Sequence, residues 1–299
     1  MKKFLATVRA PFFTGVIVPV ILGTAIAWHA GYPVHWGYFF LTLIGIIAIH
    51  AGANTINDYF DHLSSNDEIN EEYVRPFTGG SRMIQDQSIT PKGMLRLSIA
   101  MYALGAVIGL YLAYSRGMPI FWIGLIGVAM GVLYVAPGVN LLSRGVGELA
   151  ILIAFGVLCV QGSYYVQTQS LDLEPLLLSL PIGMLIMLVL WINEFPDFNA
   201  DQAVGKNHWV VRLGKEKAAK YYFAFLAVTY AMIIILALLY NLWLLVALLM
   251  LPHAWKIGRN AVKNYADTKA LIPSNAGTIL AHLLTGILLT CGYIIDTIV

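Results

Sequence analysis

Long apolar runs, each roughly 20 residues in length, recur along the whole chain and are separated by mostly short polar segments. A run of this length can cross the hydrocarbon core of a membrane as a helix. Apolar residues make up 59% of the 299 residues, and charged residues only 11%. The pattern therefore predicts an all-α, polytopic membrane protein with a single transmembrane domain over residues 1–299. The nine predicted spans are residues 12–30, 36–57, 93–114, 119–137, 146–167, 175–194, 218–239, 241–258 and 276–296.

The basic residues indicate how these spans are oriented. The chain has 18 Lys and Arg residues, and nine spans with a cytoplasmic N-terminus would leave only Arg116 outside. Because basic residues favour cytoplasmic loops, we expect a multi-pass protein of the cell (inner, cytoplasmic) membrane with its C-terminus outside. The net charge of +2 does not indicate a nucleic-acid partner. The two cysteines fall in apolar spans, where they are expected to pack rather than to form a disulfide.

The densest group of charges follows the second span. The stretch from Asn54 to Arg82 holds six of the chain's 16 acidic residues and ends in arginines. Its charged residues singled out here are Asp58, Asp61, Asp67, Glu68, Glu71, Glu72, Arg75 and Arg82. Mg²⁺ takes oxygen ligands and commonly binds one or two carboxylates together with substrate phosphates, and arginine holds phosphate oxygens in a fork. This first acidic stretch therefore predicts a site for a polyanion that is carried by Mg²⁺.

A second acidic stretch, from Asn193 to Arg212, follows the sixth span. Asn193, Asp197 and Asp201 are four residues apart, so on a helix they would share one face. Asn57 and Asp61 repeat this spacing in the first stretch. Both stretches follow even-numbered spans, so both are expected at the cytoplasmic face, where they could converge on one ligand. The alternative is a pair of solvated acidic loops, which does not explain the repeated spacing.

A polyprenyl diphosphate suits such a site, because its charged head would stay at the rim while its apolar tail enters the bilayer. Carboxylates at the rim would bind Mg²⁺, which neutralises a leaving diphosphate. The candidate metal ligands are Asp58, Asp61, Asp67, Asp197 and Asp201, with Asp61 and Asp197 also expected to be catalytic. The candidate diphosphate contacts are Arg75, Arg82, Lys206 and Arg212, with Asn57 and Asn193 beside them. For the basic residues, the alternative role is positioning at the membrane surface.

Two other classes of function remain open on the residues alone. A secondary transporter keeps its ion and substrate sites near the middle of the bilayer. Here the centres of the predicted spans carry no Asp, Glu, Lys or Arg, which favours chemistry at the rim over passage across the membrane. A phospholipid-forming phosphotransferase also uses Mg²⁺ and membrane carboxylates, but it would release a nucleotide rather than diphosphate.

Five segments together resemble the UbiA superfamily of intramembrane aromatic prenyltransferases, and the resemblance covers nearly the whole chain. NDYFD (57–61) and RPFTGG (75–80) are similar to the first motif and the arginine-proline segment after it. DFNADQAVGK with VVRLG (197–214) is similar to the second motif. YVAPGVNLLSRGVGE (134–148) resembles the loop between the fourth and fifth spans. GSYYVQT (162–168) resembles a segment of the menaquinone branch, the 1,4-dihydroxy-2-naphthoate prenyltransferases.

This resemblance implies a UbiA-like helical bundle and a reaction. Loss of diphosphate with the help of Mg²⁺ gives an allylic cation, and an electron-rich aromatic ring attacks it to form a carbon–carbon bond. Tyr134 and Tyr164 are then expected to shield the cation, and Gln167 to contact substrate. Arg144, together with Glu148, is expected to position the acceptor. For the tyrosines and Arg144, packing and placement at the membrane surface are the alternatives.

The naphthoate branch makes 1,4-dihydroxy-2-naphthoate, in menaquinone biosynthesis, the first expected acceptor. The superfamily's commonest first motif is Asn-xxx-Asp-xxx-Asp, whereas here Ser65 takes the third position and Asp67 follows it. The menaquinone branch also has its last acid displaced. The segment 66–80 is similar to chlorophyll-synthase-like members as well. The acceptor therefore stays open among the naphthoate, 4-hydroxybenzoate, homogentisate and chlorophyllide.

Overall fold

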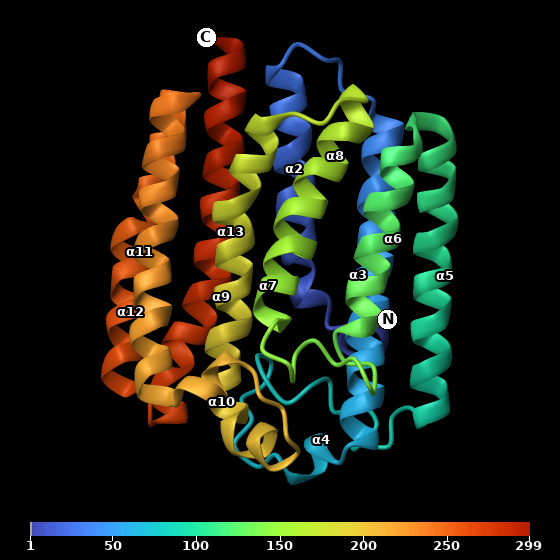
Figure 1. Cartoon of the computed structure of the whole chain (residues 1–299), viewed down its shortest axis with the longest axis vertical. Coiled ribbons are helices and arrows are strands. Elements are labelled where there is room, and N and C mark those ends of the chain that lie inside the picture. The colour runs from blue at the N-terminus through green and yellow to red at the C-terminus, as the bar shows by residue number, and fades with distance from the viewer. Residues whose placement is uncertain (1) are drawn as a thin grey trace.

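The computed structural model describes residues 2–299, which form helices and loops and contain no strand (Figure 1). The elements are α1 (Lys2–Thr7), η1 (Ala10–Phe13), α2 (Thr14–His29), α3 (Trp36–Leu63), α4 (Asn66–Ile69), α5 (Pro91–Arg116), α6 (Met118–Leu133), α7 (Gly147–Ile151), η2 (Leu152–Leu158), α8 (Cys159–Thr168), α9 (Leu173–Ala203), α10 (Trp209–Leu213), α11 (Lys215–Leu239), η3 (Leu242–Met250), α12 (Leu251–Asn264) and α13 (Thr268–Ile298).

The all-helical, membrane-spanning class predicted from the sequence is confirmed. Among the described residues, eight helical segments are long and apolar enough to cross a membrane. They are 10–29, 36–63, 91–116, 147–168, 173–203, 215–239, 242–264 and 268–298. The fourth predicted span corresponds to α6, which is apolar but has only 16 residues.

Two helices continue beyond the ends of their apolar runs. The second and sixth spans were predicted to end at residues 57 and 194, but α3 reaches Leu63 and α9 reaches Ala203. Hydropathy marks only where lipid contact ends, and the polar turns that follow stay helical because their side chains find partners inside the protein. Gly205, with a φ of 76°, comes just after the end of α9, as is common after a helix terminus. The Asn-xxx-Asp units therefore lie on helices and not in loops.

The helix α9 is packed on several sides, which fixes the position of its polar end. It contacts η2, α11 and α13, and Trp191 on it is fully buried and donates a hydrogen bond to the carbonyl oxygen of Ala218 at 3.2 Å. Where η2 crosses α9, a Cβ atom on Gly156 would lie 2.5 Å from the Cα atom of Gly183, so only glycine fits there. This packing holds the last turns of α9 against the rest of the bundle.

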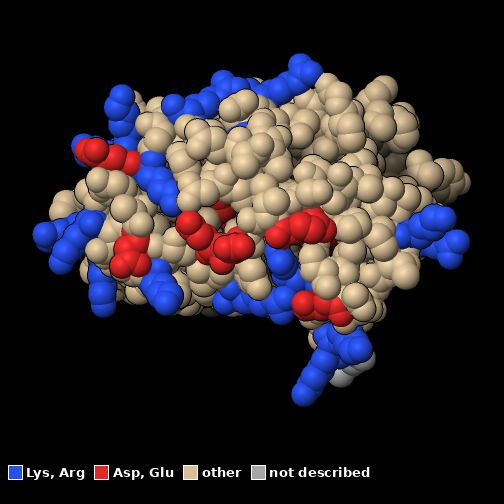
Figure 2. Space-filling model, turned by 90° about the horizontal axis from the view of Figure 1, so that it is seen from below, with Lys and Arg blue, Asp and Glu red and all other residues tan. Residues whose placement is uncertain are grey.

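The polar connections gather at one end of the bundle. In Figure 1, α4, α10 and the long loop before α5 lie at the lower end, while the C-terminus lies at the upper end. Figure 2 views the lower end, with acidic side chains toward the middle of the face and basic side chains around much of its edge. The polar ends of α3 and α9 belong to this same end of the molecule (Figure 1).

Candidate active site

The two acidic stretches meet at the polar end of a cavity of about 320 Å³. The cavity is lined at this end by residues of α3, α4, the segment 77–80, α9 and the loop before α10. Its polar lining includes Arg9, Asn54, Asn57, Asp61, Asn66, Asp67, Thr78, Asn193, Glu194, Asp197, Asp201, Lys206 and His208. The prediction that the two stretches converge is therefore matched by the structure.

The remainder of the cavity is apolar and runs between the helices. Aliphatic and aromatic side chains from α2, α3, η2 and α9 line it, among them Val16, Ile49, Phe155 and Ile186. On α6, a Cβ atom placed on Gly124 would meet nothing within 4 Å, so this wall leaves open space. An apolar passage that ends in charged groups suits a ligand with an anionic head and a hydrocarbon tail.

Asp61 and Asp58 occupy the polar end of α3 but face different partners. Asp61 accepts a hydrogen bond from the amide nitrogen of Asn57 at 2.7 Å, one turn earlier on the same face of the helix. Its other oxygen lies 2.7 Å from Nζ of Lys206. Asp58 pairs with the guanidinium of Arg9 and also accepts from the backbone N–H of Ser81 at 3.3 Å.

Asparagines of the first stretch bind the aspartates of the second. Asn66 donates to Asp201 at 3.1 Å, and Asn70 donates to Asp197 at 2.7 Å. Asp201 also lies 3.3 Å from Nζ of Lys206, so this lysine bridges Asp61 and Asp201. The two stretches thus form one hydrogen-bonded unit across the cavity end.

Charges concentrated in this buried unit shift the pKa values of its loop residues. Burial raises the pKa of Asp67 to about 8, and the carboxylates of Asp61 and Asp58 add to the effect. For Lys206, burial alone would lower the pKa, but the negative charges of Asp61 and Asp201 outweigh it and raise the pKa above its usual value. The site therefore favours additional positive charge, whether from protons or from a cation.

The carboxylates at this cavity end fit Mg²⁺. The Oδ2 atom of Asp67 is buried and has no hydrogen-bond partner, and Asp61, Asp197 and Asp201 line the same space. Carboxylate oxygens are the hard ligands that Mg²⁺ prefers. Asp58, which is held by Arg9, lies behind the cavity lining.

Four predicted diphosphate or acceptor contacts do not line the cavity. Arg75 is half-exposed and pairs with Asp86 at 3.0 Å. The guanidinium of Arg82 donates to the backbone carbonyl of Asp67, and so it braces the loop that carries a candidate ligand. Arg144 and Arg212 are exposed, and they donate to the carbonyl oxygens of Gly138 and Asn207 at 2.6 and 2.5 Å.

The predicted aromatic and amide contacts are divided between the two ends of the bundle. Tyr134 lines the cavity, and its buried hydroxyl has no hydrogen-bond partner. Tyr164 instead donates to Asp172, and Gln167 accepts from the backbone N–H of His35 at 2.8 Å. His35 precedes the start of α3, and Asp61 lies roughly 40 Å further along that helix at 1.5 Å per residue.

Several polar residues of the cavity lining were not predicted from the sequence, among them Arg9, Glu194 and His208. Arg9 was considered only for its effect on orientation, although it pairs with Asp58. Glu194 and His208 lie inside the second acidic stretch but outside its repeated spacing. Burial lowers the pKa of His208, yet the carboxylates of Glu194 and Asp201 outweigh it and raise the pKa to about 10. For Glu194 and His208, their sequence positions close to Asp197 and Asp201 could have indicated a role in the site.

The apolar cavity of this helical membrane bundle ends in carboxylates, a lysine and an arginine. This arrangement is typical of integral membrane proteins that bind amphiphilic anions. Comparison with known proteins identifies the family within this class. The family model described as "UbiA prenyltransferase family" matches residues 16–289. A 2-carboxy-1,4-naphthoquinone phytyltransferase from Synechocystis sp. is 28% identical over 98% of this chain and 93% of its own. The 1,4-dihydroxy-2-naphthoate octaprenyltransferase from Mycobacterium tuberculosis is 30% identical over 94% of this chain and 93% of its own.

Solved structures of the same fold agree with this result. A UbiA homolog from Archaeoglobus fulgidus bound to DMAPP and Mg²⁺ superposes with a TM-score of 0.67, at 16% identity, over 99% of each chain. The chain therefore belongs to the UbiA prenyltransferase family, and the resemblance seen in its motifs is confirmed. Members of this family are enzymes, so the protein is a prenyltransferase.

Proposed function

We propose that the protein transfers a polyprenyl group from a polyprenyl diphosphate to an aromatic acceptor, with 1,4-dihydroxy-2-naphthoate as that acceptor. The observation that carries the proposal is the convergence of both acidic stretches on the polar end of one apolar cavity. The cavity would hold the prenyl tail, and the charged end would hold the diphosphate. The whole chain, residues 1–299, would act as one transmembrane domain.

The residues at the polar end of the cavity would have two roles in diphosphate release, binding Mg²⁺ and pairing with phosphate oxygens. Asp61, Asp67, Asp197 and Asp201 would hold Mg²⁺. Asp58, which lies behind the cavity lining, would hold the Arg9 guanidinium in place. Bound there, Mg²⁺ would neutralise the charge of the leaving diphosphate. Lys206 and Arg9 are placed to pair with further phosphate oxygens, because both are basic and line the same space.

The cation formed by diphosphate loss needs protection from water. Most of the cavity is lined by apolar side chains, which would shield the cation, and the ring of Tyr134 lies in this lining, where an aromatic face can stabilise positive charge. In the naphthoate, the ring carbon that bears the carboxylate would form the new bond to the prenyl carbon. The carboxylate then leaves as carbon dioxide and its bonding electrons restore the aromatic ring, so no external base is required.

The named relatives support the naphthoate as acceptor over 4-hydroxybenzoate, homogentisate or chlorophyllide. Relatives from Bacillus subtilis and Mycobacterium tuberculosis are named for 1,4-dihydroxy-2-naphthoate, and the Synechocystis relative for the corresponding naphthoquinone acid. Their bacterial origin also supports the inner membrane as location. With nine spans, counting α6, the N-terminus and both acidic stretches would be cytoplasmic, and the basic edge in Figure 2 agrees with that side.

A reconstituted assay tests this proposal. Purified protein in lipid nanodiscs would be supplied with Mg²⁺, a polyprenyl diphosphate and each candidate acceptor in turn, and released pyrophosphate and prenylated product would be measured. We expect the naphthoate to yield a prenylated naphthoquinol with one carbon dioxide and one pyrophosphate per turnover. Much faster turnover of 4-hydroxybenzoate or a chlorophyllide would refute the naphthoate as acceptor. Failure to release pyrophosphate with any acceptor would refute the proposed prenyl transfer.

A further inference from the structure

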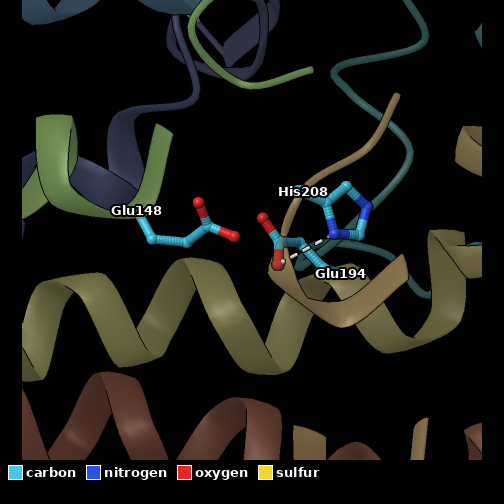
Figure 3. A group of neighbouring side chains, drawn as sticks. All are labelled: Glu148, Glu194 and His208. Carbon is cyan, nitrogen blue, oxygen red and sulfur yellow. Dashed lines mark ion pairs between the residues drawn. The ribbon is translucent and has the colours of Figure 1, made fainter. Parts of the chain in front are cut away.

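A second group of metal-ligand side chains lies next to the aspartate unit. Glu148 on α7, Glu194 on α9 and His208 before α10 each offer a donor atom, and these atoms all lie within 4.8 Å of one another. Figure 3 shows the two carboxylates pointing toward each other, with the imidazole on the far side of Glu194. Three separate segments of the chain thus converge on one small volume.

The two carboxylates in this group are buried without enough partners. Glu148 is fully buried and its Oε2 atom has no hydrogen-bond partner, while Glu194 is 4% exposed and is paired through Oε2 with His208 at 3.2 Å (Figure 3). The remaining oxygen of Glu148 accepts from the backbone N–H of Trp209 at 2.5 Å, which fixes the direction of the free one. Two carboxylates buried this close together are stabilised by positive charge beside them, and the free oxygen of Glu148 leaves room for a cation in addition to the pairing of Glu194 with His208.

The imidazole of His208 is oriented as a metal ligand would be. Its Nε2 atom lies 3.1 Å from Oδ2 of Asp201, and its Nδ1 atom lies 3.2 Å from Oε2 of Glu194. The contact with Glu194 is an ion pair (Figure 3), so a metal ion bound to Nδ1 would displace the proton there, while Nε2–H still faces Asp201. A carboxylate behind the far nitrogen is the usual support of a metal-bound histidine.

We propose that Glu148, Glu194 and His208 bind one divalent transition-metal ion, of the Zn²⁺ type, in addition to the Mg²⁺ at the aspartate unit. Two carboxylates and a neutral imidazole balance the charge of a divalent ion, and the nitrogen ligand favours Zn²⁺ over Mg²⁺. Glu194 and His208 line the cavity, so an ion can enter from it. The ion ties α7 and α9 to the loop before α10 and so steadies Asp201 through His208.

Metal binding to the full chain tests this site without any prenyl substrate. Chelator-treated protein in detergent would be saturated with Mg²⁺ to occupy the aspartates, and Zn²⁺ binding would then be measured by equilibrium dialysis and elemental analysis. We expect one Zn²⁺ per chain for the wild type and for Asp197→Asn. Glu194→Gln and His208→Gln should each weaken binding by more than ~10-fold. The exposed controls Glu216→Gln and His35→Gln should bind as the wild type does, with folding checked by gel filtration and circular dichroism.

X-ray absorption of the Zn²⁺-loaded wild type decides the question even if a variant fails to fold. We expect nitrogen and oxygen ligands at about 2.0–2.2 Å, including a single imidazole. The proposal is overturned if folded wild type binds no Zn²⁺ under excess Mg²⁺, if the imidazole signal is absent, or if Glu194→Gln and His208→Gln bind as tightly as the controls. None of these outcomes alters the prenyl-transfer assay, so the two proposals fail separately.

Discussion

Lys206, from the second acidic stretch, lies 2.7 Å from the carboxylate of Asp61 in the first stretch. Both side chains are only about a tenth exposed, and the same ammonium lies 3.3 Å from Asp201. A buried charge that loses its partner lowers the stability of the folded state. Lys206, Asp61 and Asp201 therefore act as one electrostatic unit. This contact joins the two halves of the proposed diphosphate site.

Replacing Lys206 by Met should therefore affect both activity and stability. Asp61 would be left buried without its cationic partner, and loss of a buried partner costs about 3 kcal/mol of folding stability. We expect kcat/KM for the polyprenyl diphosphate to fall at least ~10-fold, the loss of about one charge-assisted contact to phosphate. Steady-state kinetics and thermal melting would measure the two effects. Lys217→Met, at an exposed position, is the matched control, and equal behaviour of the two variants would refute the role of Lys206.

Removal of Mg²⁺ should stop turnover reversibly. We expect a chelator to abolish pyrophosphate release and added Mg²⁺ to restore it. Because Mg²⁺ binds the folded site only, it should also stabilise the protein, by about 2.7 kcal/mol at 100 times its Kd. A thermal melt in which Mg²⁺ stabilises wild type and Asp61→Asn equally would contradict binding at this site.

The part played by Tyr134 can be divided between its ring and its hydroxyl group. The ring lines the cavity, and the hydroxyl is buried without a partner. If the ring stabilises the cation, Tyr134→Phe should keep most of kcat, whereas Tyr134→Leu should lose about 10-fold, the worth of a cation–π contact of 1–2 kcal/mol. Single-turnover rates with a fixed acceptor would measure this. Equal losses in the two variants would point to packing or to the hydroxyl group instead.

The proposed orientation predicts which side of the membrane reaches each end of the bundle. In a variant without Cys159 and Cys291, a cysteine at position 71 should react with an impermeant maleimide only from the cytoplasmic side. Position 71 is exposed and lies on the loop that carries the first acidic stretch. Position 171, exposed between α8 and α9 at the other end, is the control and should react only from outside. The reverse pattern would place the site on the outer face and exclude a cytoplasmic diphosphate.

Local patterns in the sequence were enough for the helices and for part of the site. The length of an apolar run is a local property, so the spans could be predicted even though their polar ends could not. Asp61, Asp197 and Asp201 could be predicted to face one ligand because spacing by four residues places side chains on one side of a helix. Lys206 could be included because it follows those aspartates directly.

Other parts of the site depend on contacts that no local pattern records. Arg9 resembles any basic residue near an N-terminus until the fold brings it to Asp58. Arg75 and Arg144 lie in loops, where no helical period sets the direction of a side chain, and both turn away from the cavity. Tyr164 belongs to a segment that resembles a branch of the family, but the direction of α8 carries it to the opposite end of the bundle.

If both acidic stretches form one diphosphate site, prenyl transfer by Asp61→Asn, Asp197→Asn and the double variant should reveal it. Each single change removes one ligand charge beside the leaving group while keeping the size of the side chain. We predict that each lowers kcat/KM at least ~10²-fold, and that the double variant falls little further because the residues act as a unit. Mild losses no larger than that of Lys217→Ala would show that the acids are only a solvated face, and would contradict a shared diphosphate site.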